Sequence, residues 1–240
     1  MIAIIMAAGK GERLGYMTKN IPKALVKLNE KELLRYIIDM ASFVNVKQII
    51  IIGGSRFKEI KNYISKSEEE ITLIENKEFS WGNLHTLLKA APYLDDDFLL
   101  FNVDHVFSKP ILTNFSSKYA KSDDIVVFCD QNKLIDDQMR IKTCELGLQK
   151  MSKNLQDFDT GYIGLTFCPQ SMVTVYKNAC NKVLNEKRES AIVEDVLNYL
   201  AEKNIAIQCS DIDNEIWFEV DTPDDFHQAE KLILKNPNIF

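Results

Sequence analysis

The sequence predicts an α/β protein with a Rossmann-like, mostly parallel sheet and helices on both faces of that sheet. Short apolar runs alternate with amphipathic stretches through the first half of the 240 residues. The apolar runs lack the polar face of a half-exposed strand, which is typical of strands buried on both sides. The first run breaks directly into a glycine-rich loop, as strands do at the ligand-binding edge of such sheets.

The first half alternates strands and helices in a regular order. We expect strands at 3–7, 47–54 (KQIIIIGG), 71–74, 96–104 (DDFLLFNVD) and 124–130 (DIVVFCD), and helices at 32–43, 57–65 and 84–91. The crossovers between such strands are right-handed.

The pattern changes after residue 130. Residues 138–165 read as several short strands and predict a smaller antiparallel or mixed region. Helices are expected at 171–184, 193–202 and 223–235, and strands at 205–209 and 215–220. Because the sequence contains no repeat, low-complexity tract or long linker, we predict one domain over 1–240. The change of pattern divides this domain into two halves at about residue 130.

The bulk composition excludes several classes of function. Apolar residues make up 46% and charged residues 27%, and the net charge is −6. The negative charge argues against nucleic acid or an anionic membrane as partner. The five cysteines are scattered without a C-x-x-C pair, which favours reduced thiols, and residues 2–8 are too short for a membrane span. We expect a cytoplasmic protein without membrane insertion; the sequence leaves a homodimer open.

The glycine loop at 9–15 (GKGERLG) is suited to binding an anion. Two glycines let backbone N–H groups approach a phosphate, and Lys10 and Arg13 add positive charge. Lys23 follows Pro22, whose ring stiffens the chain that presents it. The loop matches neither the dinucleotide pattern nor the ATPase P-loop, so a dehydrogenase is disfavoured, whereas an ordinary strand–helix turn stays open.

Two aspartates at strand ends are candidate ligands for Mg²⁺. Asp104 ends the strand in LLFNVDHVFS, and Asp221 ends the strand in EIWFEVDTPDDF. The helix after Asp221 is already capped by Thr222 and Asp225, which frees Asp221 for another role. His105 is a weaker candidate, because a histidine beside such an aspartate more often orients a loop.

Two further segments are candidates for binding the base and the acceptor. Asn83 either caps a helix or, with Gly82, lies against a base. The second segment, in the second half of the chain, contains two lysines followed by an aspartate, a threonine and a glycine. A lysine can bind a phosphate, and a carboxylate with a hydroxyl can bind a polyol; the alternative is a solvated charged hairpin. This group consists of Lys150, Lys153, Asp159, Thr160 and Gly161.

The A-A-G-x-G-x-R-L loop followed by P-K-A-L resembles the nucleotide-diphospho-sugar pyrophosphorylase group of nucleotidyltransferases. The resemblance spans residues 1 to about 230 and implies that family's fold. It implies that residues up to about 130 form the nucleotide-binding half and that residues from about 131 to 240 form the half that binds the acceptor and supplies the second metal ligand. It implies that the loop, with Ala7, Ala8, Gly9, Lys10 and Gly11, wraps a nucleoside triphosphate, and that Gly82 and Asn83 lie over the base. It also implies catalytic roles for Arg13 and Lys23, and a metal site at Asp104 and Asp221.

Further motifs resemble the inositol-1-phosphate cytidylyltransferases. These are D-H-V-F-S at 104–108, K-N-L-Q-D-F-D at 153–159, D-T-G-Y at 159–162 and E-I-W-F-E-V-D-T at 215–222. The resemblance implies transfer of CMP from CTP to inositol-1-phosphate, giving CDP-inositol and pyrophosphate. One departure is a shortened segment before D-T-G, so that Asp159 serves two motif positions.

Several alternatives stay open. They are a cytidylyltransferase for phosphocholine or aminoethylphosphonate, a sugar-1-phosphate nucleotidyltransferase that uses UTP or CTP, and an inactive relative that senses nucleotides.

Overall fold

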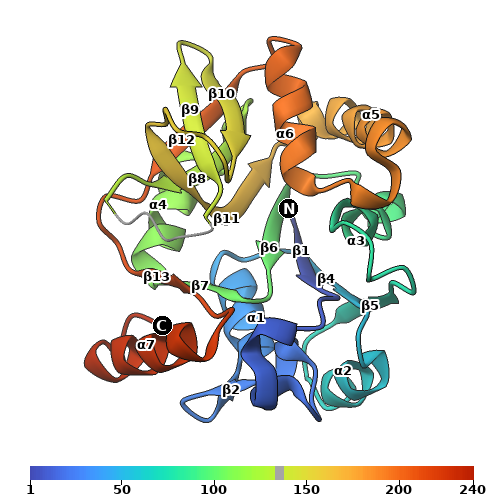
Figure 1. The fold of residues 1–240 in the computed structure, drawn as a ribbon, viewed down its shortest axis with the longest axis vertical. Helices are drawn as coiled ribbons and strands as arrows, with labels where there is room; N and C mark the ends of the chain where they lie inside the picture. Colours follow the sequence, from blue (N-terminus) through green and yellow to red (C-terminus); the bar gives the residue numbers. More distant parts are fainter. Residues whose placement is uncertain (133–137) are drawn as a thin grey trace.

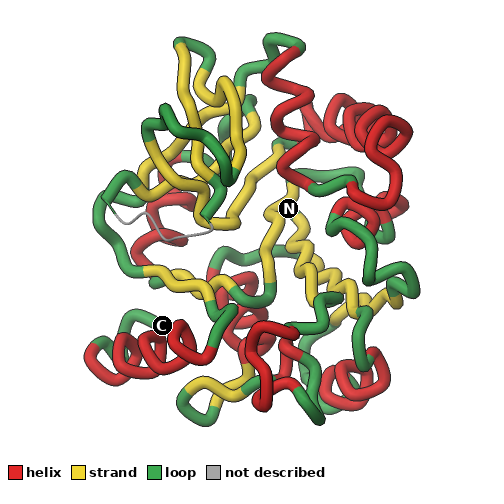
Figure 2. The backbone as a smooth tube through the Cα atoms, in the orientation of Figure 1, coloured by secondary structure: helices red, strands yellow, loops and turns green. Residues whose placement is uncertain are grey.

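The computed structural model describes residues 1–132 and 138–240, and its main feature is a sheet that runs through the whole molecule (Figures 1 and 2). Within the described residues this sheet has nine strands. In spatial order they are β5 (Ile71–Glu75), β4 (Gln48–Gly53), β1 (Ile2–Ala7), β6 (Phe98–Asn102), β11 (Thr160–Cys168), β8 (Ile125–Asp130), β12 (Ile207–Asp211), β10 (Gly147–Ser152) and β9 (Arg140–Cys144).

The four neighbouring strands β5, β4, β1 and β6 confirm the predicted parallel sheet. β1 pairs in parallel with β4 on one side and β6 on the other, and every residue of β1 is buried. Its side chains alternate between two apolar layers, with Ala3 and Ile5 on one face and Ile2 and Ile4 on the other. A strand covered on both faces has no polar face, which is why the apolar pattern was informative.

Helices cover both faces, as predicted. Helices α1 (Leu33–Phe43), α2 (Phe57–Ile64), α4 (Lys109–Lys118) and α7 (Pro223–Lys235) contribute to the layer of Ala3 and Ile5, whereas α3 (Leu84–Leu88), α5 (Gln170–Lys187) and α6 (Val193–Glu202) contribute to the layer of Ile2 and Ile4. The sequence reading assigned no helix at α4, where three buried apolar side chains among polar ones give only a weak helical pattern.

The second half of the chain extends the same sheet. β9 and β10 form the expected antiparallel hairpin, but they join the main sheet through β12 and β11. β11 lies in the middle and runs antiparallel to both β6 and β8, with all of its residues buried. The chain beyond residue 130 is therefore joined to the first half through shared strand pairing.

A small antiparallel ribbon beside the sheet positions the site. β7 (His105–Phe107) pairs with β13 (Trp217–Glu219), and His105 lies opposite Glu219. The backbone N–H of Val220 donates to the carbonyl of Asp104 at 2.9 Å. This ribbon brings together two aspartates that are far apart in the sequence. A second ribbon joins β2 (Lys27–Leu28) to β3 (Lys31–Glu32).

None of the helices among the described residues is both long enough and apolar enough to cross a bilayer.

Candidate functional site

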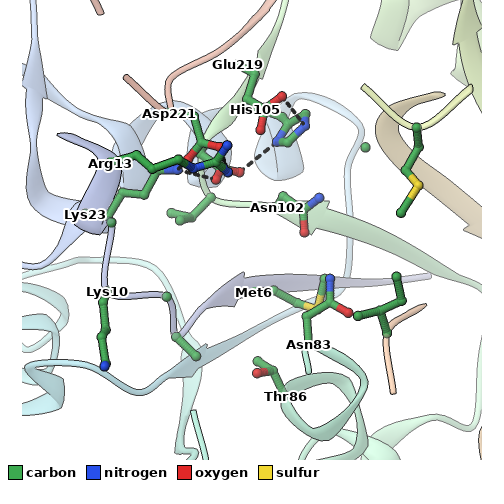
Figure 3. A pocket seen from close by; sticks show the side chains of 18 of the residues that line it. Met6, Lys10, Arg13, Lys23, Asn83, Thr86, Asn102, His105, Glu219 and Asp221 are labelled. Carbon is green, nitrogen blue, oxygen red and sulfur yellow. Dashed lines mark hydrogen bonds and ion pairs between the residues drawn. The ribbon is translucent and has the colours of Figure 1, made fainter. Parts of the chain in front are cut away.

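A cavity of about 660 Å³ opens at the carboxyl ends of β1 and β6. Ligands bind at this edge in open α/β sheets. The predicted residues that line it are Ala8, Gly9, Lys10, Gly11, Arg13, Lys23, Asn83, Asp104, Lys153 and Asp221. Figure 3 shows one cluster of charged residues at one end of the cavity, Met6, Asn83 and Thr86 at another, and Lys10 apart from both; the cluster consists of Arg13, Lys23, His105, Glu219 and Asp221.

The glycine loop packs directly against Lys23. Gly11 has a φ of 68°, in the left-handed region that favours glycine. A Cβ built on Gly11 would lie 2.8 Å from the Cβ of Lys23, so a larger residue would push the lysine away. The hydroxyl of Thr18 donates to the carbonyl of Gly11 at 2.8 Å and holds the turn. The loop and the lysine are thus built as one unit.

Asp104 and Asp221 converge on the ammonium group of Lys23. The Nζ atom lies 2.5 Å from Oδ2 of Asp104 and 2.5 Å from Oδ1 of Asp221, and Arg13 forms an ion pair with Asp221. The two carboxylate oxygens can therefore be no further apart than twice that distance. Below, these two aspartates are called the carboxylate pair. The structure brings together all four side chains for which the sequence predicted catalytic roles.

The electrostatics of this cluster favour its ionised forms. Burial alone would lower the pKa of the Lys23 ammonium, but the charges of Asp104 and Asp221 outweigh it and raise that pKa. Burial would likewise raise the pKa of Asp104, yet Lys23 and then His105 hold it well below its ordinary value. Lys23 is therefore a permanent cation between two anions.

His105 fixes the orientation of Asp104. Its Nδ1 lies 2.7 Å from Oδ1 of Asp104, and its Nε2 lies 3.7 Å from Glu219. The imidazole is parallel to the indole of Trp217, with ring centroids 6.1 Å apart, and Trp217 Nε1 donates to Asp130 at 2.8 Å. His105 is therefore held between a carboxylate on each side and the indole of Trp217.

The donor set at the charged end suits a hard divalent cation. The carboxylate pair offers oxygen atoms that already meet at one cation, and Mg²⁺ prefers such oxygen ligands. Asp104, His105 and Glu219 form a second cluster, with ligand atoms within 4.8 Å of one another. In that cluster both ring nitrogens of His105 already face carboxylates, so the carboxylate pair fits Mg²⁺ better.

The residues predicted to contact the base are only partly in the cavity. Asn83 lines it, but its Oδ1 accepts a hydrogen bond from the backbone N–H of Val193, so it caps α6 rather than its own helix. Gly82 lies behind it, where a Cβ would come 2.1 Å from the carbonyl of Ala191. Ala7 is buried in β1 and does not belong to the lining.

Most of the predicted acceptor residues lie outside the cavity. Asp159 accepts hydrogen bonds from Lys142 and Thr143 and so links the start of β11 to β9. Lys150 is exposed on β10. Thr160 is buried, and Gly161 packs against the Gln138 side chain. Lys153 alone of this group lines the cavity.

Several lining residues were not singled out from the sequence. They are Met6, Thr86, Asn102, Gln138, Tyr162, Glu194 and Glu219. For Glu219 a signal existed, because alternate residues of a strand share a face and Glu219 stands two positions before Asp221. For Glu194 no local signal existed, since it sits in an ordinary first helical turn.

The chain is similar to several known proteins. Over 235 residues the chain is 27% identical to the "Bifunctional IPC transferase and DIPP synthase" of Aquifex aeolicus, covering 97% of this chain and 52% of that protein. The chain thus spans about half the length of that relative. It is 26% identical to the CTP:phosphoglutamine cytidylyltransferase of Campylobacter jejuni, covering 96% of this chain and all of the relative.

Solved structures share the fold. The inositol-1-phosphate CTP transferase from T. maritima superposes with a TM-score of 0.80 at 20% identity, covering 97% of this chain and 96% of that one. The CTP:phosphocholine cytidylyltransferase from Streptococcus pneumoniae gives a TM-score of 0.75 at 21% identity, covering 97% and 99%. Residues 3–203 match the family model described as the MobA-like NTP transferase domain, and the chain therefore belongs to this family of nucleotidyltransferase domains.

Proposed function

We propose that the protein transfers CMP from CTP to a phosphomonoester, with inositol-1-phosphate as the first acceptor to test, giving CDP-inositol and pyrophosphate. The observation that carries this proposal is the meeting of Arg13, Lys23 and the carboxylate pair beside the glycine loop. Two cations and two anions at the mouth of one cavity suit a triphosphate bound with a divalent ion.

Different charged residues would bind the phosphates and the divalent ion. The backbone of the glycine loop and the side chains of Lys10 and Arg13 face the cavity, where they would bind phosphate oxygens. The carboxylate pair would hold Mg²⁺, which supplies charge neutralisation between the phosphates when bound. Lys23 would then turn from the carboxylates toward the phosphate at which the reaction occurs.

The chemical step needs alignment more than proton transfer. An oxygen of the acceptor phosphate forms a bond to the α-phosphorus of CTP, and the bond from that phosphorus to the pyrophosphate oxygen breaks. A phosphomonoester has its second pKa near about 6, so at neutral pH the attacking oxygen is largely deprotonated. No general base is required, which fits a site whose histidine is held between two carboxylates. Positioning and charge stabilisation account for the catalysis.

Similar proteins support CTP as the nucleotide substrate, and the lining of the cavity supports a polyol phosphate as the acceptor. Relatives named for CTP-dependent transfer cover nearly the whole chain. A quaternary ammonium acceptor would favour several aromatic faces. Among the described residues that line the cavity, the six-membered aromatic rings are those of Phe79 and Tyr162, and Trp217 is buried behind His105. This lining favours a polyol phosphate over phosphocholine.

The test is pyrophosphate release with CTP, Mg²⁺ and a panel of three phosphomonoesters and one phosphonate. The panel contains inositol-1-phosphate, phosphocholine, aminoethylphosphonate and a sugar-1-phosphate, and UTP replaces CTP in a parallel series. We expect release with CTP and inositol-1-phosphate, loss of it in Asp104→Asn, and retention in Lys150→Ala, since Lys150 is exposed outside the cavity. Absence of release with every pair would contradict the proposal, and preference for another pair would reassign the substrate.

A further inference from the structure

Glu194 is a buried acid whose carboxyl group has its own backbone N–H as a hydrogen-bond partner. It lies in the first turn of α6, only 8% of it is exposed, and it lines the same cavity as the charged cluster. Within residues 1–132 and 138–240, its carboxyl group forms no ion pair or hydrogen bond with another residue's side chain. A carboxyl group has two oxygens and about four acceptor positions, so most of the hydrogen-bonding capacity of Glu194 is left for a ligand in the cavity.

Glu194 follows Val193, whose backbone N–H donates to Asn83 at 2.8 Å, so this wall of the cavity continues from Asn83 along the start of α6. Lys153, Tyr162 and Gln138 line this region with Glu194. The hydroxyl of Tyr162 is already bonded to Thr166 at 2.6 Å, so it does not serve Glu194. The charges of Lys153 and His105 are close enough to affect the carboxyl group. A ligand at this wall therefore meets a cation and a buried acid together.

Burial makes the charged form of Glu194 less favourable than it is for an exposed acid. Burial raises the pKa of its carboxyl group above the ordinary range, although Lys153 and His105 act in the opposite direction. The raised pKa brings the neutral form of the acid closer to working pH. A carboxyl group of this kind exchanges hydrogen bonds with hydroxyl groups in either protonation state.

We propose that Glu194 forms hydrogen bonds with the hydroxyl groups of a polyol phosphate acceptor, while Lys153 binds the phosphate of that acceptor. This assignment rests on the proposed function and names the residue that selects the acceptor. Adjacent hydroxyls of a polyol can bond both carboxyl oxygens, whereas phosphocholine has no hydrogen-bond donor to offer. A site built to bond a hydroxyl rejects analogues without one strongly, since its own polar group is then left unpaired.

The experiment compares Glu194→Leu, Glu194→Gln and the control Glu202→Gln, which lies exposed on the same helix. For Glu194→Leu we expect a KM for inositol-1-phosphate raised about 100-fold or more, with the KM for CTP changed less than about threefold. Glu194→Gln keeps a hydrogen-bond acceptor and should show a smaller rise. The control should behave as the wild type does.

Thermal unfolding separates this role from a structural one. Replacing a buried acid by leucine removes a desolvation cost, so the melting temperature of Glu194→Leu should stay equal or rise. A lower melting temperature together with equal rises in both KM values would show that Glu194 supports the fold and would overturn the inference.

Calorimetric titration of inositol-1-phosphate in the presence of Mg²⁺ and a non-hydrolysable CTP analogue distinguishes this inference from the proposed function. Binding to the wild type that is lost in Glu194→Leu supports the inference, even if no pyrophosphate is released and the transfer reaction is refuted. Binding unchanged by the substitution, or absent from the wild type, overturns it. Tighter binding of phosphocholine that is lost in Glu194→Gln would also overturn it, in favour of a cationic acceptor.

Discussion

Lys23 has two partners that a divalent ion would also need. Its ammonium lies between the oxygens of Asp104 and Asp221 and is almost fully buried. With Arg13 on Asp221, two positive charges balance two negative ones. A metal ion bound to both carboxylates would have to displace Lys23, and a bound triphosphate would draw Lys23 away. Under the proposed function, this geometry would couple binding of the metal to binding of the nucleotide.

The variant Lys23→Met tests this coupling. With the ammonium gone, the carboxylate pair keeps less compensating charge, and Mn²⁺ alone should bind about tenfold more tightly than to the wild type, within the usual range for coupled sites. Turnover should fall by about 100-fold or more, because a cation at the reacting phosphate is lost. Electron paramagnetic resonance of free Mn²⁺ measures the affinity without nucleotide. Lys10→Met is the control, since Lys10 pairs with Glu12 instead; equal Mn²⁺ affinity in all three proteins would refute the coupling.

At the scale of elements, β11 and the β7–β13 ribbon hold the site. The pairing of β11 with β8 shifts register between Tyr162 and Thr166, and Gly164 lies inside that shift with a φ of +79°. A Cβ there would come 2.5 Å from the ring of His105. The irregularity in β11 thus provides the space that the histidine occupies beside Asp104.

The substitution Gly164→Ala should disturb both the strand and the site. The strained backbone costs about 1–3 kcal/mol, and the collision displaces His105 from Asp104. We expect a lower melting temperature and weaker Mn²⁺ binding in the presence of a CTP analogue. Gly15→Ala is the control for stability, because Gly15 shares a positive φ but has open space around it. If Gly164→Ala were no less stable than Gly15→Ala, the proposed collision with His105 would be wrong.

The sequence predicted best those features that depend on neighbouring residues in the chain. Fully apolar strands such as β1 and β4 predicted a covered parallel sheet, and the spacing of Asp221 from its helix cap left it free for the site. The place of β11 could not be predicted, because strand order depends on distant pairing. The role of Asp159 in linking β11 to β9 and the burial of Glu194 likewise depend on contacts that no local spacing encodes.

At the scale of the whole molecule, the fold brings residues from the first and last parts of the sequence together at one site. The glycine loop follows β1, Asp104 follows β6, and Asp221 follows β13 near the C-terminal helix (Figures 1 and 3). The chain must complete most of the sheet before the carboxylate pair exists. The central claim is that this pair, assembled across the molecule, holds one divalent ion beside a bound triphosphate.

Mn²⁺ binding in the presence of a non-hydrolysable CTP analogue measures this claim most directly. Asp104→Asn and Asp221→Asn should each weaken Mn²⁺ binding, and the double variant should bind it little more weakly than either single variant, since both residues serve one ion. Melting temperatures within a few degrees of the wild type would show that the fold is kept. Wild-type Mn²⁺ affinity in either single variant, with the fold intact, would contradict the account.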